Sequence, residues 1–374
     1  MTRRVFIAAT RQNDGKTTVS LGLFKALRQR DASLQYMKPV GQQYKIIHGK
    51  KIDKDAVLFQ NAFHLNADHL SSMSPVASPS GFTQSYIESP NPDSLHAKII
   101  DADTHLTRDA TAILYEGTGH AGVGSVFDLS NARVAQLLKS PVIIVSIGGI
   151  GKAIDEIMLN ASVFNQIGVP IMGVIINKVR PEKYDKINHF VRQGLSRLGL
   201  PVLGVIPLND QLTFPTINAI IDELTPTVIS LNNSSQNNSI ENFLIGDMMP
   251  HNVLGHIRKN TVMIIPGNRE GLVLTAVCEH LLNTEPTMVS GIIFTNGIRP
   301  HQKILDLLYK SHIPLLMLDE DAFSIATKIN NMIVKIRLED QHKITIAGQM
   351  IEEYVDIDTI YTKMADTSWA SPPL

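Results

Sequence analysis

A Gly-Lys-Thr sequence stands between a short apolar run and an amphipathic stretch near the start of the chain. The apolar run is VFIAAT at residues 5–10, and Gly15, Lys16 and Thr17 lead directly into a helical pattern. A loop at the N-terminus of a helix directs several backbone N–H groups toward one point, where the helix dipole and a mobile lysine add positive charge. We therefore interpret residues 10–18 as a phosphate-binding loop that joins a strand to a helix.

The first position of this loop departs from the usual pattern. Thr10 stands five residues before Gly15, where a glycine is expected. Lys16 would still reach the β- and γ-phosphates of a nucleotide, and Thr17 would still offer its hydroxyl to Mg²⁺. The alternative is a Gly-Lys-Thr that occurs by chance at a helix start. The candidate nucleotide-binding residues of the loop are Thr10, Asn13, Asp14, Gly15, Lys16, Thr17 and Thr18.

Short apolar runs alternate with helical patterns over the first 210 residues, which predicts an α/β fold with a parallel sheet covered by helices on both faces. The predicted strands are 5–10, 34–40, 111–116, 141–147, 170–177 and 202–206. The predicted helices are 16–30, 54–63, 131–139, 152–167 and 182–198. Segment 65–93 is dense in Ser and Pro, and we expect it to be an irregular excursion over the edge of the sheet.

After Pro207 the alternation restarts and predicts a second, smaller α/β domain. Its predicted strands are 243–247, 261–265, 288–294 and 313–318, its predicted helices are 216–225, 269–282, 301–311 and 322–333, and a polar loop covers 231–241. We expect three parts in the chain: a nucleotide-binding domain at 1–212, the smaller domain at 213–335, and a C-terminal helix (341–353) with a polar tail ending in SPPL at 336–374.

Charge and composition exclude several classes of partner. The net charge is −1, from 34 basic and 35 acidic residues, so neither nucleic acid nor an anionic membrane is expected as a partner. The longest apolar runs fall well short of the ~20 residues of a membrane span, and the N-terminus lacks a signal-peptide core. We expect a cytoplasmic protein. Its one cysteine, Cys278, allows no disulfide within the chain and is expected to be buried in a helix.

Four segments of the first domain share a pattern with one family of ATP-dependent enzymes. The segments are ATRQNDGKT (9–17), YMKPVGQQ (36–43), KDAVLFQ (54–60) and AILYEGTGHAGVGS (112–125). They resemble the phosphate loop, the Lys-Pro-Val strand end, the Asp-Ala-x-x-x-Gln helix start and the Glu-Gly-Ala-Gly segment of dethiobiotin synthetases. The resemblance implies a P-loop NTPase fold of the dethiobiotin-synthetase type, with ATP and Mg²⁺ as cofactors.

The same resemblance assigns roles to individual side chains. Lys16 and Lys38 would be catalytic and would stabilise the transferring phosphoryl group, while Thr17, Asp55 and Glu116 would hold the metal ion. On local pattern alone, the alternative for Lys38 is a solvated lysine before a turn, and Asp55 is equally a first-turn acid favoured by the helix dipole. The string after Glu116 also contains G-x-G-x-x-G, but no acidic residue follows about 20 positions later at a second strand end, which argues against a dinucleotide fold.

Two further strand ends correspond to the base-binding edge of the family. Asn177 ends the predicted strand in GVIINKV, and Pro207 follows LGVI. The resemblance gives Asn177 a contact with adenine and places Pro207 close to the base. The alternative for Asn177 is an asparagine that terminates a strand in a turn.

The loop also differs from that of the synthetases. Ala9 replaces a glycine, Arg11 replaces an aspartate, and Gln12 and Asn13 stand where the family has a threonine and a variable residue. We therefore expect that the phosphate cradle is retained, whereas the side chains that face the substrate in that family are not.

The second domain carries VMIIPGNREGLVLTAV (262–277) and GIIFTNGIRPHQKILDLL (291–308). These segments resemble the DRTGG domain, and the combination resembles the N-terminal region of long bacterial phosphotransacetylases without their acetyltransferase domain. Similar proteins are also described as cobyrinic acid a,c-diamide synthase-like or AAA-family ATPases. We expect neither acetyl transfer nor a glutaminase. The second domain has two turns that contain glycine and arginine, one at 267–269 and one at 296–300. These turns form either an anion pocket or ordinary strand-to-helix connections.

The sequence leaves three hypotheses for function. The first is a Mg-ATP-binding protein, with or without hydrolysis, whose DRTGG-like domain binds a regulatory effector. The second is a dethiobiotin-synthetase-like ligase that activates a carboxylate or carbamate of an unknown small molecule. The third is a partitioning-type ATPase, although those loops carry a lysine after the first glycine, and Arg11 imitates it only in part. In each case we expect a homodimer.

Overall fold

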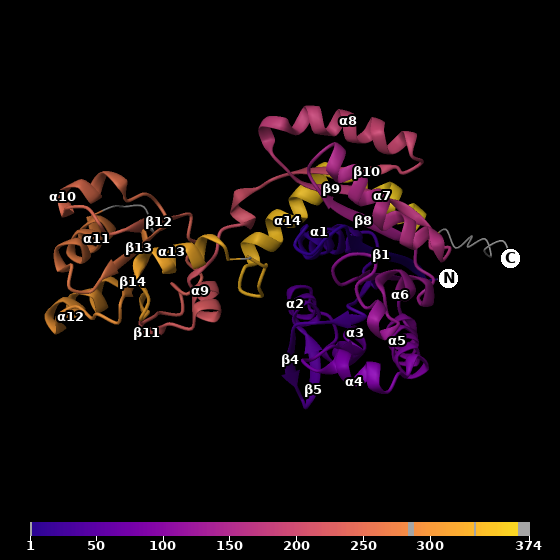
Figure 1. Ribbon diagram of the computed structural model, residues 1–374, viewed down its shortest axis with the longest axis horizontal. Coiled ribbons are helices and arrows are strands. Elements are labelled where there is room, and N and C mark those ends of the chain that lie inside the picture. The colour runs from indigo at the N-terminus through magenta and orange to yellow at the C-terminus, as the bar shows by residue number, and fades with distance from the viewer. Residues whose placement is uncertain (1, 283–287, 333, 366–374) are drawn as a thin grey trace. The chain divides into compact units, whose positions relative to one another are not determined.

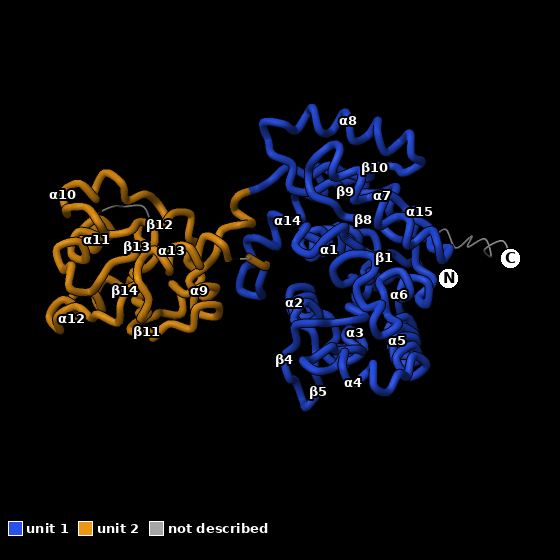
Figure 2. The backbone as a smooth tube through the Cα atoms, viewed as in Figure 1, with its two compact units in different colours: residues 1–209, 336–374 blue, residues 210–335 orange. Residues whose placement is uncertain are grey.

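A computed structural model describes residues 2–282, 288–332 and 334–365 of the chain. The polar end SPPL and the last residue of the helix predicted over 322–333 therefore lie outside the described residues. The chain forms two compact units, one of residues 1–209 together with 336–374, and one of residues 210–335 (Figure 2). Among the described residues, no helix is long and apolar enough to cross a bilayer.

The first unit is built on a parallel six-stranded sheet in the order β10-β9-β8-β1-β7-β2, with helices on both of its faces (Figure 1). These strands are β1 (Arg3–Ala9), β2 (Gln35–Met37), β7 (Ala112–Glu116), β8 (Val142–Ile147), β9 (Ile171–Val179) and β10 (Val202–Pro207). They consist mainly of buried Val, Ile, Leu and Ala, as expected for strands that are covered on both faces. The predicted α/β class is therefore confirmed.

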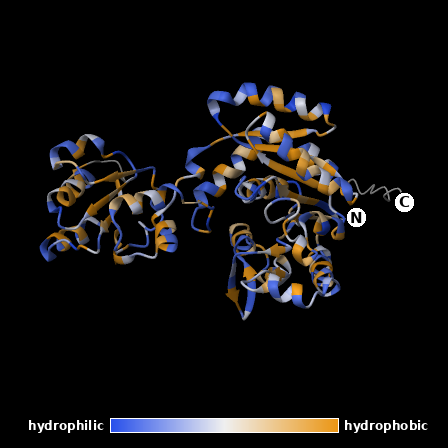
Figure 3. Ribbon diagram, in the orientation of Figure 1, coloured by the Kyte–Doolittle hydropathy of each residue, from blue (hydrophilic) through white to orange (hydrophobic). Residues whose placement is uncertain are grey.

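Helices cover both faces of this sheet and shield it from solvent. The helices of the first unit are α1 (Lys16–Arg28), α2 (Lys54–Ala62), α3 (Leu70–Met73), α4 (Phe82–Glu88), α5 (Pro92–Thr107), α6 (Asn131–Leu137), α7 (Gly151–Gln166), α8 (Tyr184–Arg197), α14 (Gln341–Tyr354) and α15 (Ile357–Lys363). Along α8, Ile187, Val191 and Leu195 are four residues apart and buried, while the polar positions between them face outward. Figure 3 shows this alternation on α8 beside the mainly hydrophobic strands.

The strand order places the phosphate loop near the middle of one sheet edge. In a parallel sheet all carboxyl ends lie at the same edge, where ligands of open α/β sheets bind. β1 lies between β7 and β8, with Ile7 opposite Glu116 and Ala9 opposite Val145. The ends of β7 and β2 therefore flank the loop on one side, and the ends of β8, β9 and β10 flank it on the other.

Helix α14 returns the chain to the first unit and packs closely against α1. A Cβ atom on Gly22 would lie 2.3 Å from Ile351 Cγ1 and 2.5 Å from the backbone oxygen of Ala347. A Cβ atom on Gly348 would lie 2.6 Å from Lys25 Cδ. Small residues on both helices thus allow their backbones to approach each other, and α14 covers the helix that begins at the phosphate loop.

We predict that Gly22→Ala lowers the free energy of unfolding of the first unit. Alanine in a helix interior normally gains up to about 1 kcal/mol over glycine. Here the new methyl group meets backbone that must move, and overpacking of this kind costs about 1–3 kcal/mol. Urea denaturation followed by circular dichroism measures the net effect. Gly194→Ala in α8 is the matched control, because its Cβ would meet only the end of the Ile154 side chain; equal effects of the two variants would contradict the prediction.

The second unit contains a five-stranded sheet in the order β11-β15-β14-β13-β12, in which only β11 is antiparallel to its neighbour. Its elements are β11 (Thr227–Ser230), β12 (Asn242–Ile245), β13 (Thr261–Pro266), β14 (Val289–Thr295), β15 (Leu315–Met317), α9 (Ile217–Leu224), α10 (Pro250–Val253), α11 (Glu270–Leu282), α12 (Gln302–Ser311) and α13 (Ala322–Asn330). Alternate strand residues enter different cores: Met263 and Ile265 pack with α10, α11 and α12, whereas Ile264 packs with α9 and α13.

Several local expectations are wrong. Segment 65–93 is not wholly irregular, because it contains α3, β6 (Val76–Ala77) and α4. Cys278 is exposed rather than buried, because it lies on the outer side of α11 while Val277 faces the core. The hairpin of β4 (Tyr44–Ile47) and β5 (Lys50–Asp53) and the helices α5 and α15 were not anticipated.

Candidate functional site

The loop between β1 and α1 has the backbone shape of an anion cradle. Asn13 and Gly15 lie in the left-handed region, with φ of 69° and 90°. Position 15 needs glycine for its positive φ and also because a Cβ atom there would lie 2.2 Å from Asn177 Nδ2. Gly15 precedes the first residue of α1, Lys16, so the loop ends at the positive end of a 13-residue helix.

Side chains within the loop brace it from inside. The Thr10 hydroxyl donates to Asp14 Oδ2 at 2.6 Å, and the Arg11 backbone N–H donates to the same oxygen at 2.9 Å. Burial raises the pKa of Asp14, while the hydrogen bond from Thr10 opposes that shift. Thr10 and Asp14 are both buried, so their side chains shape the loop rather than face solvent.

The end of β9 holds the other side of the loop. Asn177 Nδ2 donates to the Asp14 carbonyl at 3.0 Å, and Lys178 Nζ donates to the Asn13 carbonyl at 2.8 Å. Both contacts fix carbonyl groups of the loop in place. One amide hydrogen of Asn177 is thereby used for the loop, and the carbonyl oxygen of that side chain is an acceptor.

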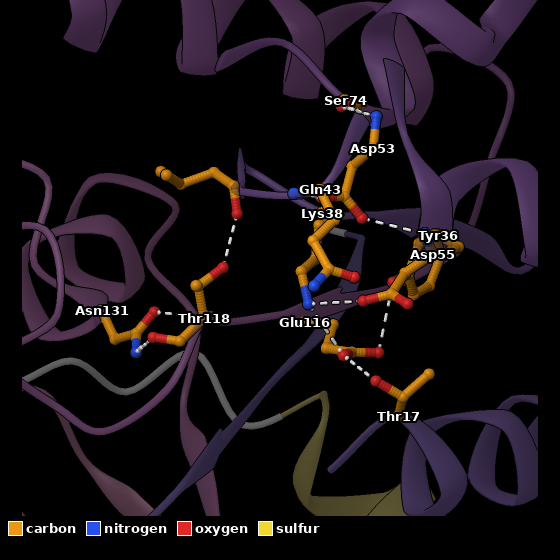
Figure 4. Close-up of polar contacts among 11 residues, drawn as sticks. Thr17, Tyr36, Lys38, Gln43, Asp53, Asp55, Ser74, Glu116, Thr118 and Asn131 are labelled. Carbon is orange, nitrogen blue, oxygen red and sulfur yellow. Dashed lines mark hydrogen bonds and ion pairs between the residues drawn. The ribbon is translucent and has the colours of Figure 1, made fainter. Parts of the chain in front are cut away.

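On the opposite side of β1, two donors and two carboxylates form one cluster (Figure 4). Glu116 Oε1 accepts from Thr17 Oγ1 at 2.7 Å and from Lys38 Nζ at 2.9 Å. Lys38 Nζ also donates to Asp55 Oδ2 at 2.9 Å. Glu116 is fully buried and Lys38 is 5% exposed. The structure thus brings together Thr17, Lys38, Asp55 and Glu116, which come from α1, the end of β2, α2 and the end of β7.

Electrostatics keep this cluster ionic. Burial lowers the pKa of Lys38, but the charges of Asp55, Glu116 and Asp53 outweigh burial and raise its pKa above the usual range. Burial and the charge of Asp55 raise the pKa of Asp53 against the opposing influence of Lys38. Lys38 therefore carries its proton and serves as the positive centre among carboxylates.

Two supporting residues were not anticipated from the sequence. Asp53 is the N-cap of α2, and its Oδ1 accepts from the Asp55 backbone N–H at 2.8 Å. The acid two residues before Asp55 was a capping signal that could have been noticed. The Tyr36 hydroxyl donates to Glu116 Oε2 at 3.2 Å, and burial raises the pKa of Tyr36, so this hydroxyl stays protonated.

An aromatic cluster anchors Tyr36. Its ring stacks on Phe59 with centroids 3.6 Å apart, and Phe24 and Phe63 pack edge-on or tilted around Phe59. These rings come from α1, β2 and α2 or the residue after it. The only polar atom that Tyr36 brings into this apolar surrounding is its hydroxyl, which points at Glu116. The local sequence carries no signal for this contact, because it depends on how β2 and β7 are paired.

The donor set of the cluster fits a hard divalent cation. Thr17 supplies a hydroxyl oxygen, and Asp55 and Glu116 supply carboxylate oxygens, which are the ligands Mg²⁺ prefers. Within the residues that the structure describes, no group of three or more His, Cys, Asp or Glu side chains could hold a metal ion by itself. Mg²⁺ commonly binds through one or two carboxylates together with phosphate oxygens and water, so these residues suit an ion that arrives with a phosphate ligand.

The remaining predicted residues occupy other positions along the same edge. Thr18 lies in the first turn of α1. Pro207 is the last residue of β10 and pairs with Val179, two residues beyond Asn177. Asn177 and Pro207 thus lie on the β9–β10 side of the phosphate loop, whereas Lys38 and Glu116 lie on the β2–β7 side. The strand order thus places these two groups on opposite sides of β1 along one sheet edge.

Arg11 is engaged within the protein. Its Nε lies 3.1 Å from Glu156 Oε2 on α7, and 3.8 Å from Asp14 Oδ1. The position at which the synthetases carry an aspartate therefore holds a cation that is paired with two acids. A ligand group at this position would meet an ion pair rather than a lone carboxylate.

The two turns of the second unit pack against each other. A Cβ on Gly267 would lie 2.2 Å from the Ile298 backbone oxygen, and Gly267 N–H donates to that oxygen at 3.2 Å. Arg269 Nη2 donates to the Met248 carbonyl at 3.0 Å. Such contacts are typical of ordinary strand-to-helix turns. They explain the presence of Gly267 and Arg269 by packing and hydrogen bonding within the protein, so no bound ligand is needed to explain these two residues.

Comparison with known proteins agrees with this architecture. A model of the AAA domain matches residues 3–216, and a model of the DRTGG domain matches residues 219–332. Phosphate acetyltransferases from Synechocystis sp. and Pseudomonas aeruginosa are both 23% identical to this chain, covering 100% and 94% of it but 54% and 51% of their own lengths. The chain therefore spans about half the length of the curated relatives it matches.

Similar solved structures include a ParA family ATPase from Chlorobium tepidum, with a TM-score of 0.35 and 16% identity over 56% of this chain and 85% of that chain. The CBS and DRTGG domains of the regulatory region of a Clostridium perfringens pyrophosphatase match with a TM-score of 0.26 and 14% identity over 42% of this chain and 76% of that chain. The AAA-domain model covers more than half of the chain, and the predicted pairing of a P-loop domain with a DRTGG domain is confirmed. The chain therefore belongs to the AAA-domain family of P-loop proteins.

Proposed function

We propose that the first unit binds ATP together with Mg²⁺ at the carboxyl edge of its sheet. The observation that carries this proposal is the convergence of Thr17 and Lys38 on Glu116 Oε1, directly beside the phosphate loop. The loop supplies backbone N–H groups and Lys16 for the phosphates, and Thr17, Asp55 and Glu116 would hold the metal ion. When bound, Mg²⁺ would neutralise phosphate charge and polarise the terminal phosphoryl group.

The β9–β10 end of the same sheet edge is the position that we propose for the adenine base. Asn177 donates one of its two amide hydrogens to the loop, and its carbonyl oxygen is an acceptor for a base at the β9–β10 side. The exocyclic amino group of adenine is a donor and complements this acceptor. Pro207, at the end of the neighbouring strand, provides an apolar surface close by.

Isothermal titration calorimetry tests the proposal. ATP is titrated into the full chain with Mg²⁺ and then with EDTA. We expect one ATP per chain and at least ten-fold tighter binding with Mg²⁺. GTP serves as the matched ligand control and should bind more weakly, because guanine presents a carbonyl oxygen where adenine presents an amino group. Absence of ATP binding under both conditions would overturn the proposal.

We further propose that the second unit, which matches the DRTGG domain, binds a regulatory effector. A ligase that activates a carboxylate or carbamate is the second candidate. It is favoured by Lys38, whose buried ammonium lies at a strand end beside the loop, where charge develops in phosphoryl transfer. The Arg11–Glu156 ion pair argues for a substrate different from that of dethiobiotin synthetase. Phosphate release that depends on an added diamine or dicarboxylate would favour the ligase, and release without any would favour a simple ATPase.

We predict that Tyr36→Phe weakens the Mg²⁺-dependent part of ATP binding by about ten-fold, a loss typical of groups that orient a metal ligand. The variant keeps the ring stack on Phe59 but removes the hydrogen bond that fixes Glu116. Tyr115→Phe is the matched control, because Tyr115 is also fully buried and its hydroxyl donates to Asp103 instead. Calorimetry in EDTA should give the same affinity for both variants. A Tyr36→Phe protein with unchanged Mg²⁺ dependence would show that this hydroxyl has no positioning role.

A further inference from the structure

The ammonium of Lys38 occupies the centre of the cluster that we assign to the metal ion. Its Nζ lies 2.9 Å from both Asp55 Oδ2 and Glu116 Oε1. These are oxygens of the two carboxylates expected to bind Mg²⁺, and Glu116 Oε1 is also the oxygen that Thr17 contacts. One buried cation therefore already neutralises the charge that a divalent cation would neutralise.

A lysine ammonium and a metal ion cannot share these oxygens at low cost. Each oxygen has a limited number of lone pairs, and two cations held side by side in a buried place repel strongly. Conversely, removing the counter-cation from a carboxylate as deeply buried as that of Glu116, beside the partly buried Asp55, is strongly destabilising. The cluster is thus stable with one cation, either Lys38 or a metal ion, but not with both at the same oxygens.

We infer that Lys38 is the internal counter-cation of the metal site, and that it gives up its contacts with Asp55 and Glu116 when a divalent cation binds. This inference rests on the proposed nucleotide site for the identity of the metal ligands. The flexible four-carbon stem of lysine allows the ammonium to move without the backbone. The released ammonium lies next to Thr17 and the phosphate loop, where it can pair with phosphate charge instead of carboxylate charge.

Two consequences follow for the protein without nucleotide. Its affinity for a free divalent cation is low, because the cation must displace Lys38 and nothing receives the released ammonium. Arrival of the cation together with phosphate removes that penalty, because the phosphate pairs with Lys38. Metal and nucleotide therefore bind cooperatively through this one side chain.

Titration of the nucleotide-free full chain with Mn²⁺ alone tests the inference, with free Mn²⁺ measured by electron paramagnetic resonance. We expect Lys38→Met to bind one Mn²⁺ at least ten-fold more tightly than the unaltered protein. Lys38→Arg, which keeps the charge, should bind Mn²⁺ as weakly as the unaltered protein. Lys54→Met is the matched control, because Lys54 is exposed and adjacent to Asp55 in sequence, and it should leave Mn²⁺ binding unchanged. Adding Glu116→Gln to Lys38→Met should abolish the gain.

Stability gives a second measurement on the same variants. Lys38→Met removes the ammonium that contacts both carboxylates, so its melting temperature should fall and should rise again in Mn²⁺, whereas that of the unaltered protein should not respond. Lys38→Gln replaces it if the methionine variant does not fold, with the same expected rescue. Equal or weaker Mn²⁺ binding by the folded variants, or no rescue by Mn²⁺, would overturn the inference. Because no nucleotide is present, this outcome is separate from a failure of ATP binding, which would overturn the proposed function instead.

Discussion

Lys16→Ala should weaken ATP binding to the full chain by roughly 100-fold, since a hydrogen bond to a charged group contributes up to about 3 kcal/mol. Lys16 is the first residue of α1 and follows Gly15, whose left-handed backbone turns the loop toward the helix. A lysine at this place carries a mobile positive charge that can follow the β- and γ-phosphates. The loss should persist in EDTA, because it does not depend on the metal ligands Asp55 and Glu116.

Lys186→Ala is the matched control for this experiment. Lys186 lies on α8 and is exposed, so the change removes one lysine without altering the loop. Calorimetry should give an unchanged affinity for this control. An affinity of Lys16→Ala equal to that of the control would show that residues 10–18 are not a phosphate-binding loop.

Phe59→Ala should lower the free energy of unfolding of the first unit by about 3–5 kcal/mol, the usual cost of removing a buried phenylalanine ring. Phe59 is fully buried and contacts three other rings, those of Phe24, Tyr36 and Phe63. The substitution leaves a cavity beneath α2 and removes the surface on which Tyr36 stacks. Binding of Mg²⁺ should therefore weaken as well, because Tyr36 is free to move away from Glu116.

Urea denaturation followed by circular dichroism measures the loss, with the transition of the first unit compared between variants. The chain has two compact units, so two transitions are expected, and only one should shift. Phe323→Ala removes an equally large but 76% exposed ring in the second unit and should change stability by less than about 0.5 kcal/mol. A shift for Phe59→Ala as small as that of Phe323→Ala would refute its central place in the core.

The buried strands were the most predictable part of the fold. VFIAAT and PVIIVSI are short apolar runs bounded by turn residues, and they correspond to β1 and β8. Helix α5 was missed although its signal is present: Leu95, Ile99, Ala102 and Leu106 are three or four residues apart, and Asn91 and Pro92 mark its start. The Ser and Pro content just before it obscured that periodicity. The β4–β5 hairpin was harder to predict, because its His48-Gly49 turn lacks the common Asn-Gly signal, although both residues have positive φ.

The candidate site likewise has a part that the sequence predicts and a part that it does not. Lys38, Asp55 and Glu116 could be proposed because the segments that carry them resemble those of dethiobiotin synthetases, and because parallel strands end at one edge of the sheet. The sequence could not show that Lys38 contacts both carboxylates, since they are 17 and 78 residues away. Nor could it show that Asn177 holds the Asp14 carbonyl, 163 residues distant. Such contacts depend on strand order and on side-chain direction, which local patterns do not specify.

The return of the chain through α14 has a consequence for biosynthesis. The second unit is a continuous segment, 210–335, whereas the first needs residues on both sides of it. On the ribosome the second unit can fold as soon as it emerges, while the face of α1 at Gly22 waits uncovered until α14 is made. A protease cut within 210–335 would accordingly leave the first unit as two fragments held together by non-covalent contacts, among them the packing of α14 on α1 and the Arg30–Asp358 ion pair.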